Sequence, residues 1–182
     1  MNRLPWASRL AQSPGLVLPV RSYIGITERR EELDKSEIRR SLNGTAVVIR
    51  PLYGTLYRTT LSASGPAVHW APAFSRLDKR TVYRIASTLH LDASIPAGAS
   101  QVTLTRDPIP GTVLAFHAED LDERRLPLAV AGRVVTLAQP AAADVYVAYC
   151  PFLDSILSER GSSAAEIEGT KEWNVIFEES RP

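Results

Sequence analysis

A phrase of fifteen residues occurs twice in this chain, and it constrains the fold more than any other feature. The first copy runs from Val102 to Phe116 and the second from Val135 to Tyr149, and the two align without a gap. Each copy begins with β-branched residues, crosses a turn that contains proline, and returns through alternating apolar and aromatic positions. Because this pattern is typical of a half-buried antiparallel pair, the repeat predicts two β-hairpins at the centre of the core.

The rest of the composition favours a mainly β protein. Thirteen prolines and ten glycines are spread over the whole length, which favours many short strands and turns. The 182 residues suit one domain or two small ones, and 45% apolar with 23% charged residues are globular proportions. We therefore expect an antiparallel β-sandwich or barrel-like domain built from hairpins over residues 27–157.

Charge and cysteine content exclude several classes of function. With 21 basic and 20 acidic residues the formal charge is +1, so the chain lacks the broad positive field of nonspecific nucleic-acid binders. No apolar run approaches the roughly 18 residues that a membrane helix needs. Cys150 is the only cysteine, so no intrachain disulfide can form. We expect a soluble protein with no specific nucleic-acid partner, no membrane insertion and no cofactor.

The first 26 residues differ from the rest because they contain arginines but no acidic residue. Pro5, Pro14 and Pro19 prevent a long helix, so an extended N-terminal arm over residues 1–26 is the favoured interpretation. A secretory signal is a rival, but Arg9 and Pro14 interrupt its apolar region. An organellar transit peptide also fits the composition, although the prolines spoil an amphipathic helix.

Three further expectations are local. Ser36 can cap a helix and Asn43-Gly44 can stop one, so a short helix is predicted near residues 36–43. Residues 45–50 and 56–62 predict a third hairpin, and residues 81–91 predict one longer strand.

The chain after Pro151 is expected to be looser. Residues 153–157 suggest a helical turn, and residues 158–182 suggest a mobile loop followed by a C-terminal strand. Trp173, Val175 and Phe177 share one face of that strand, which predicts that it packs down.

Catalytic signatures are absent from the sequence. It has no Gly-rich phosphate loop, no Gly-x-Ser-x-Gly turn and no His-Glu-x-x-His pair. The densest set of proton carriers and potential ligands is His117, Glu119, Asp120, Asp122 and Glu123. A solvated loop is the favoured interpretation, with a cation site or an acid/base pair as alternatives. We predict no catalytic residue and no metal site, and we expect Cys150 to be a small buried hydrophobe.

Aromatic residues are the other candidate binding groups. Such rings combine a large contact area with a polar handle, so they could form a platform for sugars or for a partner protein. They are dispersed among different predicted strands, which favours packing in the core and on sheet faces instead. The residues concerned are Tyr53, Tyr57, Trp70, Tyr83 and Tyr146.

Several phrases resemble structural proteins of the tails of long-tailed bacteriophages. They are Ile95–Ala99 followed by Val102–Leu104, then Val134–Leu137, then Val145–Leu153, and the closing Trp173–Glu179. A weaker likeness to tail-tip and hub-associated domains lies at Lys35–Ser41.

The resemblance implies a noncatalytic structural protein of the virion, a subunit of the tail, tail tip or baseplate, made in the host cytoplasm. It implies assembly through chain-to-chain β contacts with copies of itself and with other virion proteins. A carbohydrate- or protein-binding β-sandwich, and a hydrolase using His117 with Asp120, are the alternative hypotheses. The residues expected to contact partners are Arg3, Trp6, Arg9, Arg21, Tyr23 and Trp70.

Overall fold

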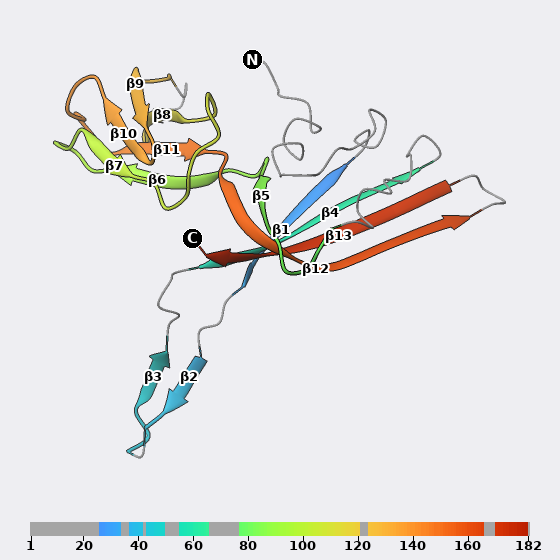
Figure 1. Cartoon of the computed structure of the whole chain (residues 1–182). Helices are drawn as coiled ribbons and strands as arrows, with labels where there is room; N and C mark the ends of the chain where they lie inside the picture. The colour runs from blue at the N-terminus through green and yellow to red at the C-terminus, as the bar shows by residue number, and fades with distance from the viewer. Residues whose placement is uncertain are drawn as a thin grey trace. The chain divides into compact units, whose positions relative to one another are not determined.

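The structure is a computed structural model that describes residues 26–33, 37–41, 43–49, 55–65, 77–120, 124–165 and 170–181. The described residues form thirteen strands and no helix, which confirms the prediction of a mainly β fold (Figure 1). The strands are β1 (Thr27–Leu33), β2 (Glu37–Arg40), β3 (Ala46–Ile49), β4 (Leu56–Gly65), β5 (Val82–Ala86), β6 (Leu91–Ile95), β7 (Gln101–Thr103), β8 (Leu114–His117), β9 (Leu128–Ala131), β10 (Val134–Leu137), β11 (Val145–Tyr149), β12 (Phe152–Ala165) and β13 (Thr170–Arg181).

The chain divides into two compact units. Unit 1 comprises residues 1–84 and 154–182, and unit 2 comprises residues 85–153. The pairs β1–β4, β4–β13, β12–β13 and β2–β3 are antiparallel, and so are the pairs within the two three-stranded sheets. Within the described ranges, no helix is long and apolar enough to cross a membrane.

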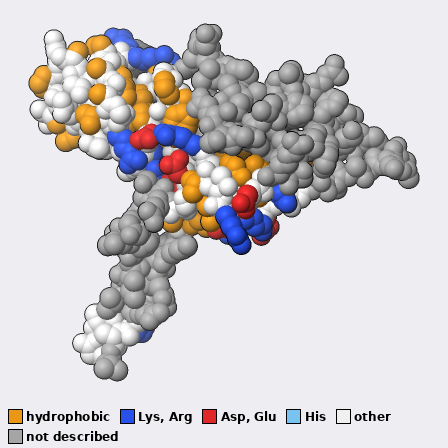
Figure 2. All heavy atoms as spheres, in the orientation of Figure 1, with side chains coloured by type: hydrophobic (Ala, Val, Ile, Leu, Met, Phe, Trp, Pro, Cys, Tyr) orange, Lys and Arg blue, Asp and Glu red, His pale blue; other side chains and the backbone are white. Residues whose placement is uncertain are grey.

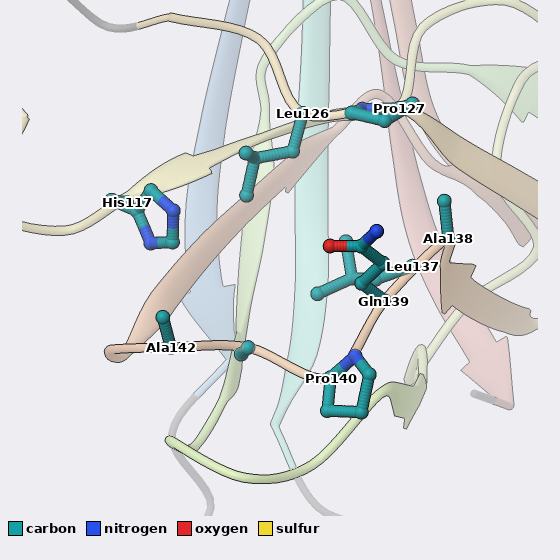
Figure 3. A pocket seen from close by; sticks show the side chains of 9 residues that line it. His117, Leu126, Pro127, Leu137, Ala138, Gln139, Pro140 and Ala142 are labelled. Carbon is teal, nitrogen blue, oxygen red and sulfur yellow. The ribbon is translucent and has the colours of Figure 1, made fainter.

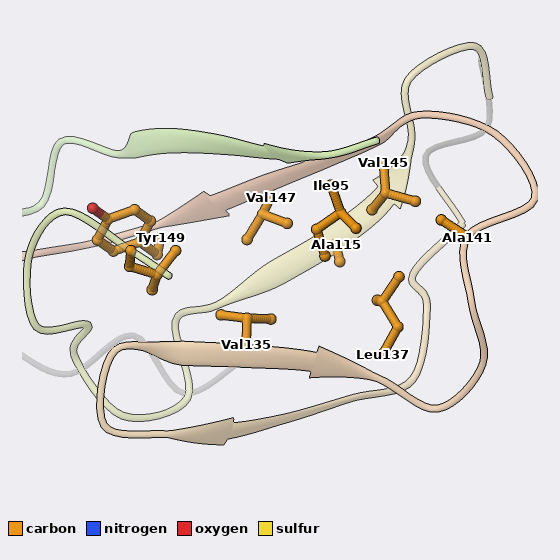
Figure 4. Packing of buried hydrophobic residues seen from close by; sticks show 9 residues of the cluster. Ile95, Ala115, Val135, Leu137, Ala141, Val145, Val147 and Tyr149 are labelled. Atoms are coloured by element: carbon orange, nitrogen blue, oxygen red, sulfur yellow. The ribbon is translucent and has the colours of Figure 1, made fainter. Parts of the chain in front are cut away.

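Unit 2 is a small sandwich of two three-stranded sheets. One sheet has the order β7-β10-β9 and the other the order β6-β11-β8. Both sheets send side chains into one buried cluster, as Figure 4 shows. Val135 and Leu137 come from the first sheet, and Ile95, Val145 and Val147 come from the second. The alternation read from the sequence therefore corresponds to one inward face on each sheet.

The repeated phrase forms the centre of unit 2, but its two copies are not hairpins. The two strands of each copy lie in different sheets, and each strand pairs with its counterpart from the other copy. Val102 lies directly opposite Val135, the equivalent residue of the second copy. The hairpin prediction is therefore wrong, because the connection within each copy carries the chain from one sheet to the other.

Tyr149 links the connection between β7 and β8 to the core. Its ring is fully buried, and its hydroxyl lies 3.0 Å from Oγ1 of Thr105 and accepts a bond from the N–H of Arg106 at 3.3 Å. The next residues of the connection bond to the chain after β11, where the N–H of Ile109 donates to the carbonyl of Cys150. A buried tyrosine thus has its polar atom satisfied by the segment that joins the two sheets.

Unit 1 is built on a five-stranded sheet of order β1-β4-β13-β12-β5. Trp173, Val175 and Phe177 are buried on one face of β13, which confirms the prediction of a packed C-terminal strand. The ring of Phe177 meets the ring of Tyr83 edge to face, with centroids 6.0 Å apart. This ring contact links β13 with β5, which lies two places away in the sheet.

Three local predictions after residue 80 need correction. The predicted strand over residues 81–91 is two strands, β5 and β6, interrupted where the N–H of Ser87 donates to the carbonyl of Pro151. The predicted helical turn at residues 153–157 is part of β12. The predicted loop after residue 158 is strand up to Ala165, because this polar run pairs along β13.

The short helix predicted near residues 36–43 is also wrong in its described part. Glu37–Arg40 is β2, which pairs with β3 instead of turning into a helix. Gly44 has a φ of 80°, so the Asn43-Gly44 pair makes the turn of a hairpin. The third predicted hairpin, between residues 45–50 and 56–62, is not formed either, because β4 pairs with β1 and β13.

Candidate functional site

A cavity of about 330 Å³ in unit 2 is the first candidate site (Figure 3). His117 stands at the end of β8, and the other walls come from the chain entering β9 and the chain leaving β10. These segments meet because Leu128 pairs with Leu137 and the N–H of Ala138 donates to the carbonyl of Pro127. The lining consists of His117, Leu126, Pro127, Leu137, Ala138, Gln139, Pro140, Ala141 and Ala142.

The polarity of this cavity limits what it can do. Its walls are hydrocarbon except for the His117 imidazole, the Gln139 amide and the backbone, and no carboxylate of the described residues lines it. Nδ1 of His117 is buried and has no hydrogen-bond partner among the described residues. General acid/base chemistry needs a second proton-transfer group within reach, which the described lining lacks. The cavity can therefore hold a small apolar group, and its described lining contains no acid/base pair.

The two described acidic residues after His117, Glu119 and Asp120, do not line the cavity. Glu119 is exposed, and Oδ2 of Asp120 accepts a bond from the backbone N–H of Arg124 at 3.3 Å. Asp122 and Glu123 lie outside the described residues. Within the part of the chain that the structure describes, no group of three His, Cys, Asp or Glu residues could hold a metal ion.

Cys150 is buried, as predicted. Its Sγ lies 3.5 Å from the carbonyl oxygen of Thr88, and it packs in a small apolar cluster with Ala86 and Ile109.

The aromatic residues that the structure describes do not form one platform. Tyr83 is buried against Phe177, and the ring of Tyr57 lies under the guanidinium of Arg30, 4.9 Å from it. Tyr146 is 38% exposed on unit 2 and packs against Phe116, with ring centroids 5.2 Å apart. Tyr53 and all six predicted partner contacts lie outside the described residues: Arg3, Trp6, Arg9, Arg21, Tyr23 and Trp70.

The edge of the β7-β10-β9 sheet is the second candidate site, and we call it the β9 edge. It is the side of Leu128–Ala131 that faces away from β10. None of these four residues is charged, and Ala129, Val130 and Ala131 are all exposed. Figure 2 shows that hydrophobic side chains occupy much of the visible surface of unit 2. An uncharged and exposed edge strand is a ready template for pairing with another chain.

The backbone of the β9 edge follows from the register. The turn at Gly132 and Arg133 joins Ala131 to Val134, and Gly132 has a φ of 59°, as a tight hairpin turn requires. The N–H of Leu137 points away from β9 and donates to the carbonyl of Ser100. Because backbone groups alternate in direction along a strand, the N–H and C=O groups of Val134 and Thr136 point toward β9. The backbone groups of Leu128 and Val130 therefore point outward. Within the described ranges they have no hydrogen-bond partner.

Side-chain direction makes the β9 edge more apolar still. Val130 lies opposite Val135, which is fully buried, so both side chains point to the core side of the sheet. Val130 is nevertheless 42% exposed, because the sheet ends there. The nearest following charge, Arg133, is held by Asp107 at 2.6 Å. Part of the apolar face of this sheet is thus open at the β9 edge.

No sequence-based prediction pointed to this edge. The uncharged run from Leu128 to Ala131, closed by Gly132, was the available signal. Its position at the end of a sheet depends on pairings between distant residues.

The comparisons with known proteins add no relative: no family model matches the chain, and no curated protein matches it.

Proposed function

We propose that the chain is a noncatalytic structural subunit of a bacteriophage tail or tail tip, which assembles with copies of itself and with other virion proteins. The observation that carries the assembly role is the uncharged, exposed β9 edge, with unbonded backbone groups at Leu128 and Val130 among the described residues. A subunit that joins neighbours by adding strands needs such an edge. The tail role rests on the resemblance in the sequence.

Strand length gives further support to a scaffold role. β12 and β13 contain 14 and 12 residues, whereas strands in globular proteins usually contain about 5–6 residues. A 14-residue strand spans about 46 Å at roughly 3.3 Å per residue. Long paired strands of this kind provide extended backbone for contacts with neighbouring subunits.

The test is the oligomeric mass of the purified full-length chain, measured by light scattering over a concentration series. A truncated chain lacking residues 1–22 is measured in parallel. We expect a mass that rises with concentration to a defined oligomer, and a weaker association in the truncated chain. A monomeric mass at every concentration would contradict the assembly proposal.

One observation favours a second function, a carbohydrate- or protein-binding β-sandwich. Tyr146 and Phe116 form a partly exposed aromatic pair on the β6-β11-β8 sheet, and sugar rings stack on such surfaces. This function predicts a monomer with saturable glycan binding that Tyr146→Ala abolishes. Absence of binding across a broad glycan array would remove the carbohydrate part of this second function.

A further inference from the structure

We infer that the partner of the β9 edge is the β9 edge of a second copy of this chain, paired antiparallel about a two-fold axis at Ala129. This inference rests on the proposed function, because it names one contact through which the subunit would assemble. It is argued from three features of the edge: its unbonded backbone groups, its register and its lack of charge.

The backbone groups select the register of the pair. Leu128 and Val130 each present one N–H and one C=O outward, which makes four groups on one copy. An antiparallel partner satisfies all of them when Leu128 of one copy lies opposite Val130 of the other. The symmetric pair then forms four hydrogen bonds, two for each pair of opposed residues. Shifting the register by two residues instead places Val130 opposite Leu126, or Leu128 opposite the turn residue Gly132.

Neither shifted register offers an equivalent set of partners. The N–H of Leu126 already donates to the carbonyl of Ala115 at 2.8 Å. Gly132 lies in the turn with a φ of 59°, which is outside the extended conformation of a strand. Only the register centred on Ala129 uses the four groups of β9 alone.

The side chains are compatible with that register. Ala129 would face its own copy across the axis, and its methyl group is small enough for close approach. Val130 would lie opposite Leu128 of the other copy, which covers the valine that the single sheet leaves 42% exposed. No charged side chain belongs to the strand, so two-fold symmetry brings no like charges together within it.

The result would be a continuous six-stranded sheet with the order β7-β10-β9 in one copy followed by β9-β10-β7 in the other. A contact of four residues on each side is short, so we expect it to be reversible on its own. In an assembly it would act together with other contacts of the subunit.

Cysteine substitution tests the register directly. In the proposed pair, Ala129 has its own counterpart as a non-hydrogen-bonded neighbour, at a Cα separation of about 4.5 Å. This separation lies within the range of about 4.4–6.8 Å that a disulfide needs. Ala131 is also small and exposed. In the proposed pair, however, Ala131 of one chain would be offset from Ala131 of the other by about four residues, or about 13 Å along the strand. Ala131→Cys is therefore the matched control for Ala129→Cys.

Both variants are made in the full-length chain with the native Cys150, which is buried, and the unmodified chain serves as background. Under mild oxidation we expect Ala129→Cys to give a covalent dimer at least about tenfold faster than Ala131→Cys, because only the former meets the disulfide distance. Equal rates would overturn the proposed register, and so would the absence of a covalent dimer from Ala129→Cys in a sample that light scattering shows to be oligomeric.

The same measurements separate the two proposals. An oligomeric mass without Ala129 crosslinking would leave assembly standing and reject β9 pairing. A monomeric mass at every concentration, without crosslinking, would reject both. Val130→Pro provides a second variant, because it removes an outward N–H and leaves the bonds to β10 in place. We expect it to fold and to lose the dimer, and an unchanged dimer would also reject the pairing.

Discussion

The edge strands β1 and β9 differ in the number of charged residues that each places at the open edge of its sheet. β1 carries Glu28, Arg29, Arg30, Glu31 and Glu32, whereas β9 carries no charge. The register places Glu28 opposite Leu61 and Arg30 opposite Thr59, so these two charges lie on the face where both partners are buried. Inward-pointing charges on an edge strand oppose pairing with another chain. The comparison teaches that unit 1 protects its β1 edge with charge while unit 2 leaves β9 open.

The charges of β1 also have local partners that hold them. Arg29 contacts Glu31 at 2.8 Å, and the guanidinium of Arg30 lies over the Tyr57 ring. On β4, the neighbouring strand, Arg58 donates two hydrogen bonds to Oε1 of Glu178 on β13, at 3.1 and 2.8 Å. The charged side chains on this side of unit 1 are therefore held by neighbours in the sheet, whereas β9 carries no charged residue.

The largest expected effect is the difference in stability between two proline substitutions at adjacent positions of β9. Ala129→Pro removes an inward N–H and leaves the carbonyl of Thr136 without its donor, which we expect to destabilise unit 2 by about 2 kcal/mol or more. Val130→Pro removes an outward N–H, and we expect it to change stability by less than about 1 kcal/mol. Denaturant unfolding of both variants measures the difference. Equal destabilisation would show that the assignment of inward and outward groups is wrong.

A second substitution gives β9 a charged residue, as β1 has. Val130→Lys puts one charge on each side of the two-fold axis of the proposed contact, and we expect it to weaken self-association at least about tenfold, equivalent to about 1.4 kcal/mol. The stability of the monomer should not change, because Val130 is 42% exposed. Sedimentation over a concentration series measures the association, with Val130→Thr as the uncharged control. Association as tight as that of the unmodified chain would contradict a role for this edge.

A third change separates the His117 cavity from the β9 edge. His117→Phe keeps a planar ring and removes a buried nitrogen that has no hydrogen-bond partner among the described residues. We expect stability to stay the same or to rise by up to about 1 kcal/mol, and assembly to stay unchanged. Thermal unfolding and light scattering measure the two effects, with the exposed His90→Phe as control. A loss of assembly would place the cavity within the interface.

The smallest effect is expected at Arg58. Hydrogen bonding to Glu178, followed by the charge of the same residue, raises the pKa of the Arg58 guanidinium. A raised pKa in the folded state gives stability that is fully present below the unfolded-state value, and that is lost only as pH rises through the folded value. Arg58→Gln should therefore lower the melting temperature slightly and equally at neutral and mildly alkaline pH. The difference should shrink with added salt, because both side chains are partly exposed.

Thermal unfolding at several salt concentrations measures this effect. A difference that grows between neutral and mildly alkaline pH would contradict the assignment to Arg58.

Strand positions could be predicted from the sequence where alternation is strong. β7, β8, β10, β11 and β13 all overlap predicted strands, because apolar and aromatic residues recur at every second position, although β13 extends beyond the predicted strand at both ends. β12 was missed along its whole length: residues 153–157 were predicted as a helical turn, and the Ser- and Gly-containing run that follows has low strand propensity and is held by pairing with β13. Asn43-Gly44 fits both a helix end and a hairpin turn, and the pairing of β2 with β3 selects the turn.

Pairing itself could not be predicted, and the candidate sites depend on it. The repeat indicated that residues 102–104 and 135–137 are equivalent, but it did not indicate that they lie side by side. His117 was singled out because of its acidic neighbours in sequence. The residues that surround it come from Leu126–Pro127 and from the chain after β10, which only the tertiary fold brings together. The β9 edge likewise exists because no described strand follows β9 in its sheet.

Amide hydrogen exchange of the four β9 residues, followed by NMR at increasing protein concentration, tests the central claim most directly. The amides of Ala129 and Ala131 bond to β10, so they should be protected at every concentration. The amides of Leu128 and Val130 should exchange rapidly in dilute samples and become protected as oligomers form. Rapid exchange of the Val130 amide in a sample that is fully oligomeric would contradict the pairing of β9 with a second copy.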